Sequence, residues 1–320
     1  MDSRIDTLLL LALPASGKSE LRRYLASLDA DVAAKDFALA PTVQLDDYPY
    51  VHLMRRIGEE MRGLGELPAF FATGFEPFLD GRDWATLIEL INEDYGALGT
   101  TPSVPDEPTA WLLDRLDRAR QLVGMDSPFD PLSDESRAAL AAALDDEIIE
   151  FATERSATLA SYESGRSTVL IEFARGGPEG TEPPLPDPHG YDYSLRHLSP
   201  EILSRSAALY VRVTPQESLL RNLERTVPGR EGDASILHHG VPETVMRGDY
   251  GVDDFLWLLE RGGGDAIEVD AHGASFTLPA AIFDNRIDQT SFLRSDQSDW
   301  DPGLVEQLHT ALTNSFADLR

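Results

Sequence analysis

The stretch TLLLLALPASGKSELRRYL, from Thr7 to Leu25, decides how the chain begins to fold. Its first residues form an apolar run that is broken by Pro14, which is typical of a short buried strand. Gly17, Lys18 and Ser19 then lead into apolar residues at helical spacing. The stretch therefore predicts a strand, a tight loop and a helix in direct succession.

The loop between this strand and helix matches most of the phosphate-binding motif known as the P-loop. That motif is Gly, four variable residues, Gly-Lys and then Ser or Thr, whereas residues 12–19 read ALPASGKS, with Ala12 in place of the first glycine. Alanine has the smallest Cβ, so it fits if φ stays negative at this position. Backbone N–H groups and the start of the helix would then surround a phosphate. We expect these residues to bind the nucleotide: Pro14, Ala15, Ser16, Gly17, Lys18, Ser19 and Glu20.

The composition limits the partners that the chain can have. It holds 320 residues and no cysteine, which excludes disulfides and thiolate chemistry. The formal net charge of −29 repels phosphate backbones and argues against a nucleic-acid partner. The first apolar run is too short to cross a bilayer, so we expect a cytoplasmic protein without a membrane partner. The chain has only two lysines, and one of them, Lys18, directly follows Gly17.

Strand and helix patterns alternate along most of the chain. Strands are predicted at 7–13, 42–45, 167–177, 207–215, 266–270 and 276–285, and helices lie between most of them. This alternation predicts an α/β protein with a three-layer parallel sheet. Residues 63–165, between the second and third strands, are mostly helical, and the pattern from Ser133 onward predicts the longest helix. We therefore expect a core of residues 1–62 and 166–320 and an inserted helical subdomain, 63–165, which is a candidate for substrate binding.

The segment LALPASGKSELRRYL resembles the P-loop of the kinase branch of P-loop NTPases, which includes nucleoside and nucleotide kinases and polynucleotide-kinase-like proteins. The resemblance covers the sheet-forming segments, about half of the chain, and does not extend to the insertion. It implies a P-loop NTPase core that binds ATP and Mg²⁺, with Lys18 on the transferring phosphate and Ser19 on the metal.

VQLDDYPY, Val43 to Tyr50, places two aspartates at the end of the second strand. The resemblance implies that an aspartate here takes the proton of the attacking hydroxyl, with Asp46 the first candidate and Asp47 the second. Either one could instead cap the helix that begins near Pro49. The small-molecule acceptor is expected beside this point, near Tyr48 and Arg55.

The third strand ends in an acidic residue, Glu172, and Arg175 follows three positions later. In P-loop proteins an acid at the end of a neighbouring strand holds the Mg²⁺ water shell or the substrate. We therefore expect Ser19 and Glu172 at the metal and Arg175 at the substrate. The alternative is a strand end with ordinary surface charges.

TPQESLLRNLER, Thr214 to Arg225, predicts a helix with Arg221 and Arg225 on one face, because residues four apart are neighbours on a helix. The resemblance implies a lid whose arginines clamp the transferring phosphates, with Arg230 in the loop beyond. The alternative is a solvated helix in which these arginines pair with nearby glutamates. His238 and His239 are adjacent, which is poor spacing for a metal site.

These features favour ATP-dependent phosphoryl transfer to a small acceptor that carries a hydroxyl or a phosphate, assisted by Mg²⁺ and an aspartate base. One alternative is a nucleotide-hydrolysing switch that transfers phosphate only to water. Another is a nucleotide-binding protein without catalytic activity, for which Ala12 is the only evidence.

Overall fold

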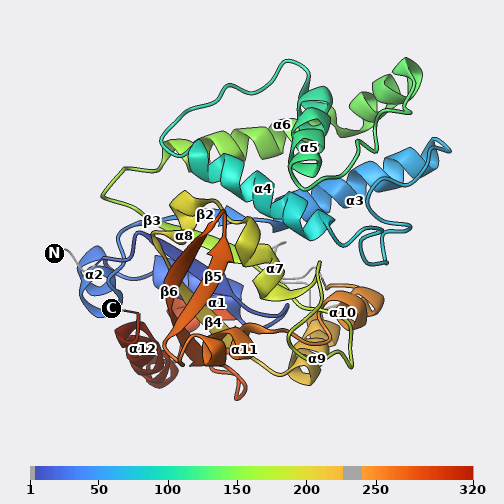
Figure 1. Ribbon diagram of the computed structural model, residues 1–320. Coiled ribbons are helices and arrows are strands. Elements are labelled where there is room, and N and C mark those ends of the chain that lie inside the picture. The colour runs from blue at the N-terminus through green and yellow to red at the C-terminus, as the bar shows by residue number, and fades with distance from the viewer. Residues whose placement is uncertain (1–3, 226–239, 320) are drawn as a thin grey trace.

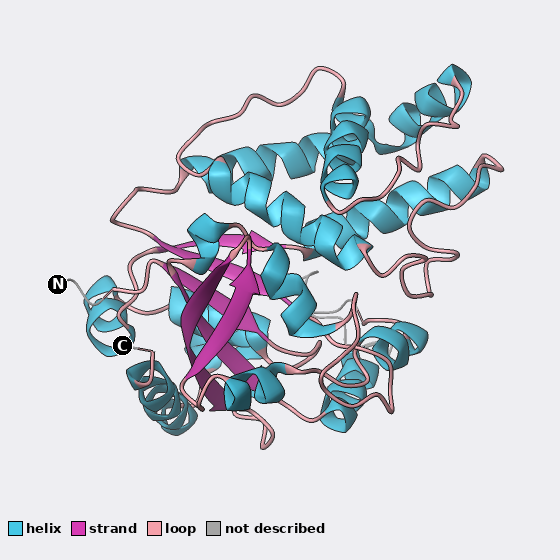
Figure 2. Ribbon diagram, in the orientation of Figure 1, coloured by secondary structure: helices cyan, strands magenta, loops and turns pink. Residues whose placement is uncertain are grey.

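The computed structural model describes residues 4–225 and 240–319, and within them six strands form one mixed sheet (Figures 1 and 2). The strands lie in the order β2-β3-β1-β4-β6-β5. This confirms the predicted α/β class and the approximate position of every predicted strand. The strand bounds are β1 Thr7–Leu11, β2 Thr42–Asp46, β3 Thr168–Phe173, β4 Ser206–Arg212, β5 Ala266–Ala271 and β6 Ala274–Asp284.

The sheet is parallel except at one edge, where β5 runs antiparallel to β6. His272 and Gly273 join these two strands with φ of 53° and 75°. Two consecutive residues with positive φ form the tight hairpin turn that suits the twist of antiparallel strands. The prediction of a fully parallel sheet was therefore wrong at this edge, because a two-residue connection cannot cross over to a parallel neighbour.

Helices cover both faces of the sheet, and the side chains of β1 alternate between them. Leu8 and Leu10 pack on one face and Leu9 and Leu11 on the other, as the period of two in a strand requires. The first face is covered by α1 Lys18–Ala26, α2 Ala30–Phe37 and α12 Pro302–Ala317. The second is covered by α7 Gly190–His197, α8 Pro200–Leu203, α11 Phe255–Arg261 and one side of α4 Asp83–Gly96.

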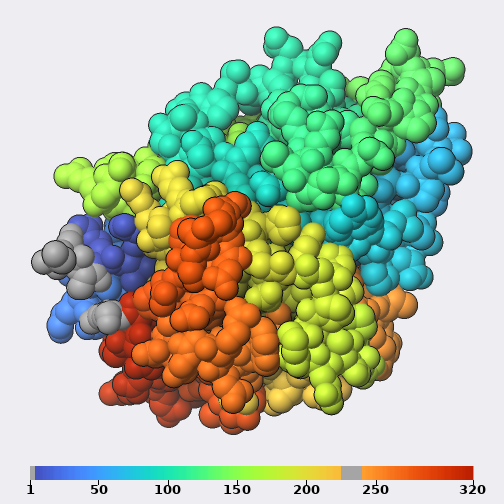
Figure 3. All heavy atoms as spheres, in the orientation of Figure 1, coloured from blue at the N-terminus to red at the C-terminus, as the bar shows by residue number. Residues whose placement is uncertain are grey.

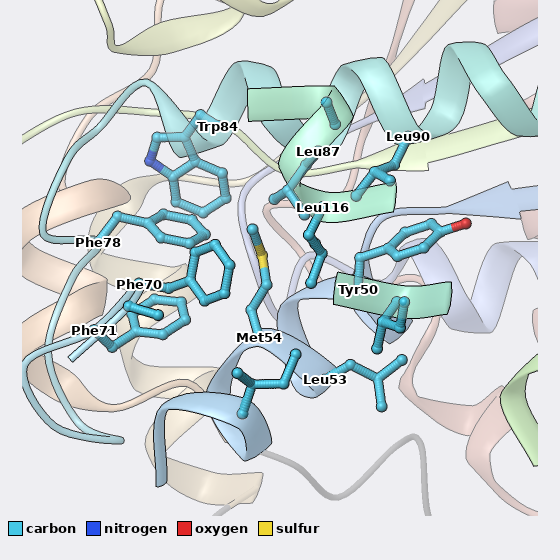
Figure 4. Packing of buried hydrophobic residues seen from close by; sticks show 14 of the residues in the cluster. Tyr50, Leu53, Met54, Phe70, Phe71, Phe78, Trp84, Leu87, Leu90 and Leu116 are labelled. Carbon is cyan, nitrogen blue, oxygen red and sulfur yellow. The ribbon is translucent and has the colours of Figure 1, made fainter. Parts of the chain in front are cut away.

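The insertion folds as a helical layer beside the sheet, coloured cyan to green in Figure 3. It consists of α4, α5 Pro108–Leu122 and α6 Asp134–Ala160, which begins with Ser133 accepting a hydrogen bond from the backbone N–H of Ser136. α3, Tyr48–Gly63, packs against α6, so the helical layer also includes a helix that precedes residue 63. A core of leucine, methionine and aromatic side chains joins these helices (Figure 4).

A buried polar cluster ties the same helices together. The carboxylate of Asp94 accepts hydrogen bonds from Tyr50 at 2.5 Å, Arg115 at 3.0 Å and Arg155 at 2.5 Å. These side chains come from α4, α3, α5 and α6 respectively. Charge-assisted bonds inside a low-dielectric core are stronger than those at a surface, so the cluster fixes the four helices relative to one another.

The remaining elements are short and lie around the carboxyl ends of the strands or after β6. They are α9 Pro215–Arg225, α10 Glu243–Asp249 and the 3₁₀ turns Ser291–Arg294 and Gln297–Asp299. The sequence patterns did not predict α2, α7, α10 or α11. In the described part of the chain, no helix combines the length and apolar character that a bilayer span requires.

Candidate functional site

A cavity of about 390 Å³ opens where β1, β2 and β3 end. Carboxyl ends of parallel strands are the usual place for ligands in open α/β sheets. The loop before α1 lines part of this cavity, and the helical layer and α10 line another part. The lining residues include Pro14 to Ser19, Arg22, Asp46, Asp47, Tyr48, Arg55, Phe71, Phe75, Phe78, Trp84, Glu172, Asp249 and Tyr250.

The loop of residues 12–17 turns sharply without the first glycine of the motif. Ala12 is fully buried and is not among the residues with positive φ, so its Cβ is accommodated. The turn is made further along, by Ala15 at φ 53° and Gly17 at φ 102°. Left-handed φ at a non-glycine residue is uncommon and is concentrated at ligand sites. The substitution at position 12 therefore leaves the course of the loop intact.

The carbonyl groups of this loop are held on its outer side. The carbonyl oxygen of Pro14 accepts a hydrogen bond from Ser218 at 2.7 Å, and that of Ser16 accepts one from Asn285 at 2.6 Å. The backbone N–H groups of residues 15 to 19 have no partner in the described ranges 4–225 and 240–319, nor does the buried hydroxyl of Ser16. Buried donors without partners are rare in proteins. A loop with free N–H groups at a helix start is a binding site for an anion such as phosphate.

Gly17 is required for two reasons, and its replacement by alanine should destabilise the protein by about 1–3 kcal/mol. Its φ is 102°, and an added Cβ would lie 2.4 Å from Oγ1 of Thr290 and 2.6 Å from Nδ2 of Asn285. Gly58→Ala is the matched control, because no atom lies within 4 Å of its Cβ position in α3. Urea unfolding should show a loss for Gly17→Ala and no loss for Gly58→Ala. Equal midpoints for the two variants would contradict this account of the loop.

Lys18 and Glu172 meet at the base of the cavity. Nζ of Lys18 lies 4.0 Å from Oε1 of Glu172 and 3.5 Å from the carbonyl oxygen of Ala12. Burial lowers the pKa of Lys18, while the carboxylates of Glu172, Asp47 and Asp46 act in the opposite direction. Ser19 lines the same end of the cavity. The structure thus brings together the predicted phosphate and metal residues.

Arg22 is a second cation here that the sequence analysis did not identify. Its Nη1 lies 3.3 Å from Oε2 of Glu172 and 3.8 Å from Oδ2 of Asp46. It follows Lys18 by four residues, so both project from the same face of α1. The spacing of four residues between Lys18 and Arg22 is present in the sequence and could have identified Arg22 as a candidate site residue.

Asp46 lies beside Glu172, its register partner on β3. Burial raises the pKa of Asp46 to about 7, with further increases from the charges of Glu172 and Asp47. Its Oδ1 accepts a 2.8 Å hydrogen bond from the backbone N–H of Tyr48, at the start of α3. The carboxyl therefore also serves the helix start, and the two interpretations of this residue are compatible.

Asp47 is directed into a buried ion pair with Arg175. Nη1 of Arg175 lies 2.6 Å from Oδ2 of Asp47, and Nε donates to Ser194 at 2.8 Å. The remaining donors of Arg175 contact the carbonyl oxygens of Ala174 and Trp84 at 2.6 Å and 3.3 Å. Arg175 is 1% exposed and does not line the cavity. The structure therefore places Arg175, which was expected at the substrate, outside the cavity lining, where it holds Asp47.

Two other predicted residues also lie outside the cavity. Glu20 projects from another face of α1 than Lys18, because two positions turn a helix by about 200°. It accepts a 2.7 Å hydrogen bond from Nε of Arg294 instead. Arg221 donates to the carbonyl oxygen of Asn285 at 2.8 Å, which fixes the segment after β6. Neither prediction of a ligand contact is supported by this placement.

Most of the second half of the predicted lid lies outside the described residues. The backbone of Arg225 ends α9, but its side chain lies outside the described residues. Arg230, His238 and His239 also lie outside the described residues.

Tyr48 and Arg55, the residues expected near the acceptor, line the cavity together with several residues that were not predicted. Arg55 donates to the carbonyl oxygen of Gly74 at 2.6 Å, and its guanidinium lies 4.0 Å from the ring centre of Phe71. Nearby stand Phe75, Phe78, Trp84, Asp249 and Tyr250. These come from separate loops and helix ends with no local motif, so no signal in the sequence marked them.

The oxygen donors at this site suit magnesium rather than a softer metal. Across residues 4–225 and 240–319, no three His, Asp or Glu side chains are grouped closely enough to hold a metal ion by themselves. A magnesium ion at Ser19 and Glu172 would therefore take most of its ligands from nucleotide oxygens and water.

A scan for known protein families and a search of curated proteins find no match to this chain.

Proposed function

We propose that this protein is a P-loop kinase-like phosphotransferase, which moves the terminal phosphoryl group of a nucleoside triphosphate such as ATP to a small hydroxyl-bearing acceptor. One observation supports the proposal most strongly. The unpartnered N–H groups of residues 15 to 19 and the carboxyl of Asp46 line a single cavity. Phosphoryl transfer requires a phosphate cradle and a base near the acceptor, and little other covalent chemistry.

The cations of the site would stabilise the transferred charge. Lys18 lies beside the cradle and Arg22 projects from the same helix face. Charge on the phosphoryl oxygens is spread in the transition state, so fixed cations in a cavity of low dielectric lower the barrier. Ser19 and Glu172 would hold a magnesium ion, which would supply further neutralisation of phosphate charge.

Asp46 would act as the base. Its carboxylate takes the proton of the acceptor hydroxyl, the acceptor oxygen bonds to the terminal phosphorus, and the bond from that phosphorus to the bridging oxygen breaks. The nucleoside diphosphate leaves with the electron pair. A base with a pKa near the working pH is the efficient choice, and the pKa of Asp46 is raised to about 7.

The volume of the cavity and the net charge of the protein both favour a small acceptor. The cavity of about 390 Å³ also has to admit the terminal phosphate. A protein with a net charge of −29 repels a polynucleotide.

Lys18→Ala should reduce nucleotide-dependent phosphate release or transfer by at least about 100-fold. Lys35→Ala is the matched control. Lys35 is the only other lysine of the sequence, its side chain is 85% exposed, and its Nζ lies 4.0 Å from Oδ1 of Asp36. The measurement is release of labelled phosphate and of labelled product from ATP and a panel of small alcohols. Product formation supports a kinase, and release that no acceptor alters supports a hydrolase. The absence of any stabilisation by ATP in thermal unfolding would refute both.

A further inference from the structure

Asp249, the last residue of α10, has a buried carboxyl group whose burial the fold does not explain. It is 5% exposed and lines the same cavity as the loop of residues 14–19. Its Oδ2 has no hydrogen-bond partner among the described residues. A buried carboxyl costs folding free energy unless a partner compensates it. A residue retained in this state points to a partner that binds from the cavity.

The position of Asp249 is fixed by the chain around it. Gly177 donates a 2.8 Å hydrogen bond to the carbonyl oxygen of Val252 and accepts one from its N–H at 3.2 Å. A Cβ on Gly176 would lie 2.4 Å from the carbonyl oxygen of Val252 and 2.8 Å from that of Asp249. Because Gly176 lacks a Cβ, the backbone of residues 249–252 packs directly against it. This contact holds Asp249 at the cavity.

The two cations closest to Asp249 do not neutralise it. Burial raises the pKa of Asp249 to about 7, and the charges of Arg55 and Arg175 act in the opposite direction without reversing this rise. Neither arginine forms an ion pair with Asp249 within 4.0 Å in the described residues. Arg175 is paired with Asp47, and Arg55 donates to Gly74 and lies over the ring of Phe71. The charge partner of Asp249 is therefore missing from the wall itself.

The surroundings of Asp249 are aromatic. The rings of Phe71 and Phe78 are stacked with centres 4.4 Å apart, Phe78 meets Trp84 edge-on at 4.8 Å, and Trp84 meets Tyr250 at 5.7 Å. Figure 4 shows Phe71, Phe78 and Trp84 following one another along this side of the core. The guanidinium of Arg55 lies 4.0 Å from the ring centre of Phe71, and that of Arg175 lies 4.7 Å from the ring centre of Trp84, so these two rings already carry cations of the protein. The rings therefore offer a bound molecule an apolar surface for its body, and Asp249 is the group that would attract its cation.

We propose that the acceptor is an amino alcohol with an aromatic or other apolar body, and that Asp249 binds its ammonium group. The apolar body packs on the wall of Phe71, Phe78, Trp84 and Tyr250. The hydroxyl then faces Asp46 and the cradle. The net charge of −29 attracts a small cation to the protein, which agrees with this class of acceptor. The inference rests on the proposed phosphotransfer for the role of the hydroxyl, but the binding of the ammonium group does not depend on it.

Three probes with the same ring test the inference without nucleotide: 2-amino-1-phenylethanol, 1-phenylethane-1,2-diol and mandelate. They share the ring and the benzylic alcohol and differ in the group on the alcohol carbon, which is aminomethyl, hydroxymethyl or carboxylate. Calorimetry or ligand-observed NMR should show the amine bound at least tenfold more tightly than the diol, and mandelate more weakly still. Asp249→Asn should remove this preference, whereas Asp270→Asn, at an exposed position on β5, should keep it. A thermal unfolding midpoint no lower than that of the wild type verifies that Asp249→Asn is folded.

Equal affinity for amine and diol, or no binding of the amine at millimolar concentration, would overturn the inference. So would a preference that survives Asp249→Asn. The two proposals fail separately, because Lys18→Ala should abolish phosphoryl transfer but preserve the amine preference. Asp249-dependent binding without ATP turnover would refute only the kinase, and Lys18-dependent turnover without the preference would refute only the amino alcohol.

Discussion

Asp46→Asn is expected to lower the rate of phosphoryl transfer by about 10²- to 10⁴-fold and to leave nucleotide affinity nearly unchanged. The amide keeps the oxygen that accepts the 2.8 Å hydrogen bond from Tyr48, so α3 still starts in the same way. What is lost is the ability to accept a proton from the acceptor. Single-turnover rates and nucleotide titration, measured on the same preparation, separate the two effects. If nucleotide affinity falls as much as the rate, Asp46 is a metal or structural residue.

The pH profile of the wild type gives a second readout of the same prediction. Burial and the charges of Glu172 and Asp47 raise the pKa of Asp46 to about 7. The base works only when deprotonated, so kcat at saturating acceptor should be level above about pH 7 and fall tenfold per pH unit below it. The measurement uses kcat because burial also raises the pKa of Asp249 to about 7, and protonation of Asp249 would lower kcat/KM through acceptor binding. Asp46→Asn should remove this acidic limb. A limb that persists in the variant would assign it to another group.

The parts of the fold that could be predicted are those that a local pattern determines. β1 is a short apolar run and α6 is a long helical pattern with a serine cap, so both are readable from sequence. The hairpin of β5 and β6 was missed because His272 takes a positive φ, which histidine adopts far less readily than glycine. α7 was missed because it follows directly on a loop rich in proline and glycine.

The candidate site likewise contains some residues that a local pattern predicts and others that only the fold brings together. Gly17, Lys18 and Glu172 follow from strand ends and a motif, since parallel strands bring their carboxyl ends together. The contacts of Glu20 and Arg221 could not be predicted from the sequence, because each side chain bonds to a residue that is far away along the chain. Asp249 and the aromatic wall come from distant segments that only tertiary packing unites.

Arg175→Met is expected to destabilise the protein by about 3–5 kcal/mol, the usual effect of removing one partner of a buried ion pair. Arg175 and Asp47 are 1% and 7% exposed, and their 2.6 Å contact lies beneath the cavity. Removing the guanidinium would leave Asp47 charged and buried and would also break the bond to Ser194. Arg166→Met is the matched control, because its 3.5 Å pair with Glu163 is largely exposed and should contribute less than about 1 kcal/mol.

The double variant Arg175→Met with Asp47→Asn separates this structural role from catalysis. Its loss of stability should be smaller than the sum of the two single losses, because the second change removes the stranded charge. Chemical denaturation of the four proteins measures this coupling. Additive losses would contradict the pairing and would return Asp47 to the list of candidate bases. A large coupling leaves Asp46 as the aspartate of this strand end that is available to the acceptor, because Asp47 is then required for the fold on which the cavity is built.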